Sequence, residues 1–178
     1  MTLPTPFIHL DSKLSMHLPE DWDFYMCYVD DKIASIYLNL ALAECMPLAH
    51  QKYVMYVQFQ MTHPREDGLS SDQDFDQLIA LEDSLVDGLE QQINAIYVGR
   101  VTSNGKRDFF FYLSHIENIE AIVRDLMQDF GVDQSRFGIR EDEQGELYLN
   151  YLFPSAATLK DMMDRRENEE VGDPDGWN

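Results

Sequence analysis

The chain has 178 residues, 44% of them hydrophobic, and its 33 acidic against 13 basic side chains give a formal net charge of -20. This length fits one domain that buries ~70% of its unfolded surface, so a core without metal or disulfide is expected. Two cysteines, Cys27 and Cys45, exclude a disulfide framework and match no zinc spacing. So acidic a surface repels nucleic-acid phosphates and anionic membranes and attracts basic proteins.

The N-terminus has neither a basic start nor a continuous apolar run, so we expect no secretory signal. No stretch approaches the ~20 apolar residues that span a bilayer. These features favour a cytoplasmic protein. We expect an irregular N-terminal arm over residues 1–20, a single α+β domain over 21–166 and an acidic disordered tail over 167–178, because the tail is poor in aliphatic side chains.

Three strands are predicted in the first third of the chain. Residues 22–29 carry apolar side chains on both faces, Asp30-Asp31 supplies a turn, and residues 33–40 alternate as a second strand. Tyr53 to Met61 alternates most regularly, with Met55, Val57, Phe59 and Met61 facing inward and Tyr56, Gln58 and Gln60 facing outward.

A long amphipathic helix is expected next, capped by Ser70 or Ser71 and ending near Ile93. Apolar residues at spacings of three and four predict its buried stripe: Phe75, Leu78, Leu81, Leu85, Leu89 and Ile93. A hairpin follows from Tyr97 to Tyr112, because Asn104-Gly105 accepts positive φ and closes tight turns.

The last third of the chain is expected to hold a second helix capped by Ser114. It carries Ile116 and ends at Gly131. Arg136 to Arg140 and Glu146 to Leu152 are interpreted as short strands around an acidic turn, and Ala156 to about Arg166 as a terminal helix.

From Tyr53 to Leu152 the expected order is strand, helix, strand, strand, helix, strand. This order is the split βαβ pattern of ferredoxin-like α+β folds, an antiparallel sheet with two helices on one face. The N-terminal hairpin of residues 22–40 would extend that sheet at one edge.

At the central hairpin the chain resembles the bacterial domain-of-unknown-function family numbered 695. The resemblance spans most of the chain and rests on Trp22, Phe24-Tyr25, Gly68-Leu69, Leu81-Glu82-Asp83, Val98 to Thr102, Gly105-Lys106-Arg107, Phe111-Tyr112 and Tyr148 to Pro154. It implies an α+β domain without an assigned reaction, ligand or cofactor. Some members look fused to a domain similar to RraB, the protein regulator of ribonuclease E activity, which is an analogy of fold only.

Basic and aromatic side chains interleave in and around the central hairpin, and they form the candidate binding site: Tyr97, Arg100, Lys106, Arg107, Tyr112 and Tyr56. If helices cover one face of the sheet, tyrosines are expected to line the other: Tyr37, Tyr56, Tyr97, Tyr112 and Tyr148. Exposed tyrosines suit protein contact, since they combine apolar area with a polar tip. The competing interpretation is that the N-terminal arm or the C-terminal helix covers this face.

Two other functions compete with protein binding. Glu82, Asp83 and Asp76 on the long helix suggest a metal-assisted hydrolase with a basic residue such as Arg107, although carboxylates on an exposed helix face are commonplace. Arg100 and Arg107 beside tyrosines suggest an RNA-binding module, which the net charge opposes.

No nucleophile elbow, phosphate-binding loop or dinucleotide fingerprint occurs in the sequence, so it supplies no support for catalysis. We expect a non-catalytic binding or regulatory module without a cofactor, whose acidic surface or open sheet face contacts a basic protein partner. A homodimer through that face is a variant of the same hypothesis. Neither nucleic acid nor a membrane is the expected partner.

Overall fold

The computed structural model describes residues 18–131 and 135–171, the side chains as far as residue 169. The predicted arm and tail therefore lie mostly outside the described residues. The elements, in chain order, are β1 (Trp22–Val29), β2 (Lys32–Asn39), η1 (Leu40–Cys45), β3 (Tyr53–Gln60), α1 (Asp72–Ile93), β4 (Ile96–Ser103), β5 (Lys106–Leu113), α2 (Ile119–Leu126), η2 (Gln128–Phe130), β6 (Ser135–Glu141), η4 (Tyr148–Leu152) and α3 (Ala156–Val171).

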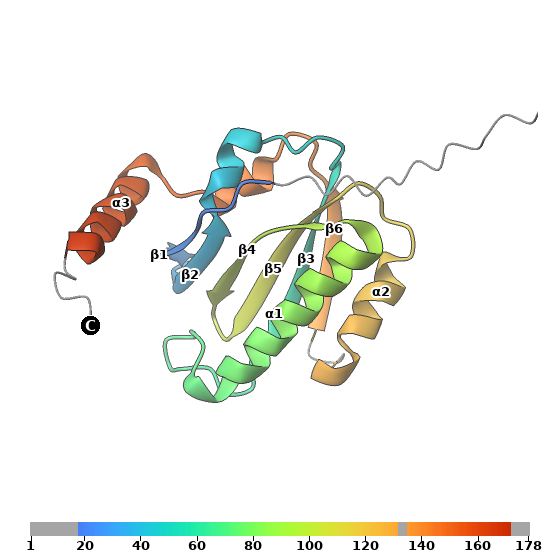
Figure 1. Cartoon of the computed structure of the whole chain (residues 1–178). Helices are drawn as coiled ribbons and strands as arrows, with labels where there is room; N and C mark the ends of the chain where they lie inside the picture. Colours follow the sequence, from blue (N-terminus) through green and yellow to red (C-terminus); the bar gives the residue numbers. More distant parts are fainter. Residues whose placement is uncertain (1–17, 132–134, 172–178) are drawn as a thin grey trace, which may run out of the picture.

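Six antiparallel strands form one sheet in the order β1-β2-β4-β5-β3-β6, so the chain is an α+β protein (Figure 1). Both predicted hairpins are confirmed. Their turns hold Asp30, Asp31, Asn104 and Gly105 at positive φ, the conformation that two-residue hairpin turns require. The β1–β2 hairpin extends the sheet at one edge by pairing β2 with β4, as the sequence predicts.

Helices α1 and α2 pack on one face of β3, β4, β5 and β6, and we call this the helix side (Figure 1). The predicted inward residues Met55, Val57 and Phe59 of β3 are fully buried there. The predicted stripe of α1 is also buried from Leu78 to Ile93, but Phe75 is 57% exposed, so that part of the prediction is wrong. Asp74 occupies the inward position instead, because its carboxylate accepts the backbone N–H of His63.

The second helix is shorter than predicted. It begins at Ile119, because the positive φ of Asn118 is incompatible with a right-handed helix that would start earlier. Ser114 therefore does not cap it. Ile116 consequently lies before the helix and is 46% exposed. Gly131 has the expected positive φ and ends η2 rather than α2.

The predicted strand from Glu146 to Leu152 is wrong, because this segment is helical. The buried carboxylate of Asp142 is the physical reason. It accepts the backbone N–H groups of Glu146 and Leu147, which caps a helical turn, and it also accepts the hydroxyl of Tyr112.

The face of the sheet opposite α1 and α2, which we call the second face, is largely covered by η1, η4 and α3. Tyr148 and Leu152 of η4 and Met162 of α3 pack there against apolar side chains of β1, β2, β4 and β5. The expectation of an open second face is therefore wrong over most of the sheet, and the alternative of a covering C-terminal helix is confirmed in part. α3 runs to Val171, beyond its predicted end at Arg166.

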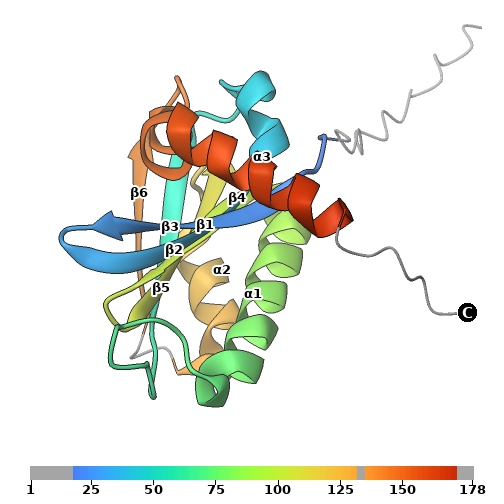
Figure 2. The same ribbon diagram turned by 90° about the vertical axis from the view of Figure 1, so that its left-hand side faces the viewer.

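The helix side of the β1–β2 hairpin, by contrast, is uncovered and lies beyond α1 (Figure 1). α3 lies across the sheet near β1, and the hairpin tip points away from its last turn (Figure 2). Within the described ranges, no helix has the length and apolar composition needed to cross a membrane.

Candidate functional site

Three of the predicted binding residues meet beneath α1, around Glu82. The Glu82 carboxylate accepts a hydrogen bond from the Tyr97 hydroxyl at 2.8 Å. Both of its oxygens also accept from one terminal nitrogen of Arg100, with which Glu82 forms an ion pair. Arg107 approaches the same carboxylate at 3.9 Å. Tyr97 and Arg100 come from β4 and Arg107 from β5, so Glu82 ties α1 to two strands.

Arg107 is almost wholly buried in this cluster. Its Nε donates to Thr102 at 2.8 Å and one terminal nitrogen donates to Ser70 at 3.4 Å, just before α1. Burial, together with the neighbouring charge of Arg100, lowers the pKa of Arg107 to about 10. One carboxylate thus faces two guanidinium groups, an arrangement that fixes the position of α1 over β4 and β5.

Arg100 also contacts an aromatic stack that reaches the first strand. Its guanidinium carbon lies 4.4 Å from the ring centroid of Tyr37, a cation–π distance. Trp22 stacks on Tyr37 at 5.2 Å and on Tyr97 at 5.4 Å between ring centroids. Tyr37 and Tyr97 therefore lie on the helix side, not on the second face where the sequence placed them.

This cluster is a poor phosphate-binding site. Arg100 and Arg107 are both engaged with Glu82, and only 25% and 9% of their side chains are exposed. A ligand phosphate would have to displace that carboxylate. The geometry thus weakens the RNA alternative at the central hairpin.

Beyond the stack, the helix side of β1 exposes a row of large apolar side chains. Phe24, Met26 and Tyr28 alternate along the strand and are 47%, 49% and 75% exposed. They share the face of Trp22, because side chains two apart in a strand point the same way. No helix covers this part of the sheet (Figure 1).

Helix α1 adds two exposed apolar side chains to the same side of the molecule. Phe75 and Ile79 are 57% and 43% exposed. They lie seven and three residues before Glu82, and therefore on the flank of α1 that carries Glu82 over β4. We give these two groups of exposed apolar side chains one name, the hairpin-side surface: Phe24, Met26, Tyr28, Phe75 and Ile79.

Carboxylates border this surface. Asp30 and Asp31 are exposed at the hairpin tip, and Asp72, Asp76 and Asp83 are exposed on α1 next to Phe75 and Ile79. An apolar area with an acidic rim complements a partner with apolar and basic groups.

The remaining predicted binding residues lie on the second face and are not brought together with the others. Tyr112 is 1% exposed, because it packs beneath η4 and donates to Asp142. It is not available for binding. Tyr56 is 39% exposed, its ring lying over Gly138, where an added Cβ would come within 2.5 Å. Lys106 belongs to the same face at the start of β5.

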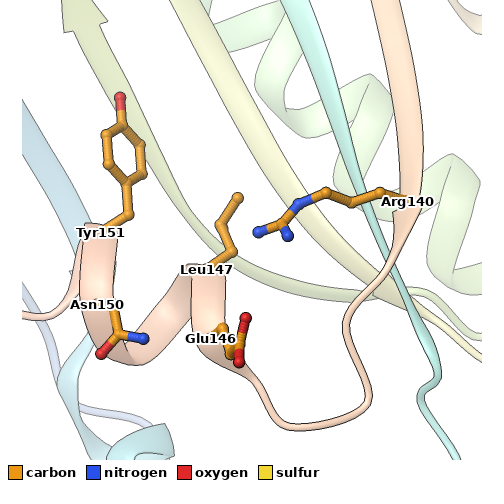
Figure 3. A pocket seen from close by; sticks show the side chains of 5 residues that line it. All are labelled: Arg140, Glu146, Leu147, Asn150 and Tyr151. Atoms are coloured by element: carbon orange, nitrogen blue, oxygen red, sulfur yellow. The ribbon is translucent and has the colours of Figure 1, made fainter.

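A shallow pocket of about 440 Å³ opens on the second face between β6 and the η4 turn (Figure 3). Arg140 points from β6 toward Leu147, with Glu146, Asn150 and Tyr151 completing the lining. Arg140 and Glu146 oppose each other in charge, and no serine, cysteine or histidine lies among the lining residues, so the pocket points to no particular reaction.

The carboxylates proposed for a metal site do not converge. Glu82 is occupied by Arg100 and Tyr97, whereas Asp76 and Asp83 are exposed on the outer side of α1. Among residues 18–131 and 135–171, no group of three histidine, cysteine or acidic side chains is placed to hold a metal ion.

Sequence reasoning missed the hairpin-side surface itself. The available signal was the first strand, whose two faces are both apolar. When helices cover only the centre of a sheet, a strand at its edge has one face buried and the other exposed. The exposure of Phe75 could not be predicted from the helix pattern, because Phe75 continues the spacing of the buried residues without being buried.

Comparisons with known proteins agree with the resemblance noted from the sequence. A family model described as "Family of unknown function (DUF695)" matches residues 20–153, from just before β1 to just after η4. No curated protein and no solved structure matches the chain.

Proposed function

Because the chain belongs to the DUF695 family, whose function is unknown, we propose from its structure that it is a non-catalytic, cytoplasmic module that binds a basic protein. One observation carries this proposal: Phe24, Met26 and Tyr28 stand exposed in a row on an ordered strand. Aromatic residues and methionine that stand exposed side by side are typical of protein interaction sites.

Charge supports a basic partner. The net charge of -20 and the acidic border of the hairpin-side surface favour a partner with lysine or arginine around an apolar centre. Such complementarity accelerates encounter and makes association sensitive to salt. A homodimer through this surface is the variant, and the mutual repulsion of two such chains weighs against it.

We also propose that the domain core is ferredoxin-like. The succession β3, α1, β4, β5, α2, β6 supports this, as does the spatial order β4-β5-β3-β6 of its strands. Both helices lie on one face, as a split βαβ unit requires.

Site-specific photocrosslinking tests the proposal. A photoreactive phenylalanine analogue replaces Tyr28 in one variant and Ile79 in a second. Ile116, which is 46% exposed against 43% for Ile79 and lies outside the hairpin-side surface, serves as the control. In the protein's own cells we expect the first two positions to yield the same crosslinked protein, and position 116 to yield none of it.

The crosslink should weaken when salt is raised and when Asp72, Asp76 and Asp83 are replaced together by Asn. Equal crosslinking from all three positions, or none from positions 28 and 79, would contradict the proposed function. A crosslink only to a second copy of the chain would replace the basic partner by the homodimer.

A further inference from the structure

The outer edge of β1 differs from an ordinary protected sheet edge. Strand β1 pairs only with β2, so half of its backbone N–H and C=O groups point outward. The parity follows from two contacts. The carbonyl of Asp21 accepts the N–H of Leu40, toward β2, whereas the carbonyl of Phe24 accepts from Arg165 of α3, away from β2. Phe24, Met26 and Tyr28 therefore present their backbone groups outward.

The first part of this edge is closed by the chain itself. The N–H of Phe24 donates to Asp23, and its carbonyl accepts from Arg165. Asp23 is held in turn by Arg165 at 2.6 Å and by Arg166 at 2.7 Å. Arg165 also lies 4.7 Å from the ring centroid of Phe24. Helix α3 thus occupies the edge of β1 at Asp23 and Phe24.

The rest of the edge is open. In the described part of the chain, no group bonds the outward N–H and C=O of Met26 or Tyr28, and their side chains are 49% and 75% exposed. An ordered edge with free backbone groups and large apolar side chains is a template for another strand.

The opposite edge of the same sheet is protected. Strand β6 carries Arg136 and Arg140, both exposed and, among the described residues, without an ion pair. Charged side chains on an edge strand discourage pairing with other strands. One edge is thus charged, and the other exposes methionine and tyrosine.

We propose that an extended, basic segment of the partner protein adds to β1 as a seventh strand, pairing with the backbone of Met26 and Tyr28. This inference rests on the proposed function and specifies its mode of binding. Alternate apolar side chains of the segment then lie beside Met26 and Tyr28, and its basic side chains meet Asp30 and Asp31 at the hairpin tip. Side-chain pockets are few on this strand, so the backbone supplies much of the contact.

A second copy of the chain fits this edge less well. Two β1 strands paired antiparallel would bring the Asp30-Asp31 tip of each copy to the Asp21 and Asp23 end of the other. Arg165 and Arg166 are already paired with Asp21 and Asp23, so that end offers no unpaired positive charge to the tip of a second copy. A basic segment, by contrast, brings its own positive charge to Asp30 and Asp31.

The test uses the full-length protein and a defined probe, an eight-residue peptide of alternating lysine and valine with blocked ends. A peptide of the same length with glutamate for lysine is the charge control. The lysine peptide with N-methyl groups on alternate residues is the backbone control, since it cannot complete the ladder. Amide hydrogen exchange, measured by NMR, reports on each backbone N–H.

We expect the lysine peptide to slow exchange at Met26 and Tyr28 at least tenfold, and both control peptides to leave it unchanged. Met26→Pro should weaken peptide binding at least tenfold relative to Met26→Ala, because both lose the side chain but only proline lacks the outward N–H. Circular dichroism confirms that both variants are folded. Equal binding by the two variants, or by the N-methylated peptide, would overturn strand addition.

Exchange in the free protein separates the other occupants. Slow exchange at Met26 and Tyr28 without peptide, at every protein concentration, would mean that the chain covers its own edge. Slow exchange only at high concentration, with dimer in sedimentation, would mean that a second copy does. Either result overturns the inference. If crosslinking from position 28 persists in Met26→Pro as in Met26→Ala, strand addition fails while the proposed function stands.

Discussion

Glu82 on α1 accepts both of its ion-pair hydrogen bonds from Arg100 on β4. This pair joins the flank of α1 to β4, the strand that pairs with β2 of the hairpin. The exposed row on β1 begins where the aromatic stack over Arg100 ends.

Replacing Glu82 by Gln should lower the free energy of unfolding by about 2 kcal/mol, because two guanidinium groups then lie beneath α1 without a counter-charge. The value is below that for a fully buried pair, since a quarter of the Arg100 side chain remains exposed. Urea unfolding measures it. Glu120→Gln removes the same charge from an exposed pair with Arg124 and should change stability by less than about 0.5 kcal/mol. Equal effects would contradict this role of Glu82.

Asp74→Ala should destabilise the protein by about 2 kcal/mol, because the backbone N–H of His63 would lose a charged acceptor at a buried position. Asp76→Ala, two residues further along the same helix turn but exposed, is the matched control and should stay within about 0.5 kcal/mol of the parent protein. Thermal unfolding compares the two. A larger loss from Asp76→Ala would refute the assignment.

Stability should fall as the pH rises above 10. Burial raises the pKa of Tyr25, Tyr112 and Tyr148 above the ordinary value of 10.0. A raised pKa in the folded state means that each contribution is complete below pH 10 and is lost as the pH rises toward the folded value. At pH 11 the loss is on the order of 1 kcal/mol for each tyrosine. Unfolding by urea between pH 8 and 11 measures the slope, which Tyr148→Phe should reduce. An unchanged slope would contradict this prediction.

Gly138→Ala should displace the Tyr56 ring, because the added Cβ would lie 2.5 Å from its Cε1 atom. We expect a loss of about 1 to 2 kcal/mol, typical of overpacking. In the Tyr56→Ala background the same substitution should cost almost nothing, since the obstacle is gone. A double-mutant cycle measures this coupling, and additive effects would mean that the ring does not rest on Gly138.

The sequence contained enough information for most of the fold. Regular alternation in β3, the positive-φ dipeptides of the two hairpins and the apolar spacing of α1 are local signals, and the elements follow them. The segment from Glu146 to Leu152 was misassigned because its helical turn depends on Asp142, a carboxylate held in place by the hydroxyl of Tyr112 on a distant strand. No local pattern contains that contact.

The candidate site was predictable only in part. Tyr97, Arg100 and Arg107 do meet, because β4 and β5 form one hairpin, but their common partner Glu82 makes the cluster structural. Exposure on β1 depends on how far α1 reaches across the sheet. That distance is set by helix–sheet packing rather than by any residue of β1.

Oxidation of two equally exposed methionines tests the central claim most directly. Met26 on the hairpin-side surface is 49% exposed, and Met163 on α3 is 50% exposed. In the isolated protein, dilute peroxide should convert both to sulfoxide at similar rates. In an extract of the protein's own cells we predict that Met26 becomes protected at least fivefold while Met163 does not. Equal rates at the two positions in the extract would contradict a partner on the β1–β2 hairpin.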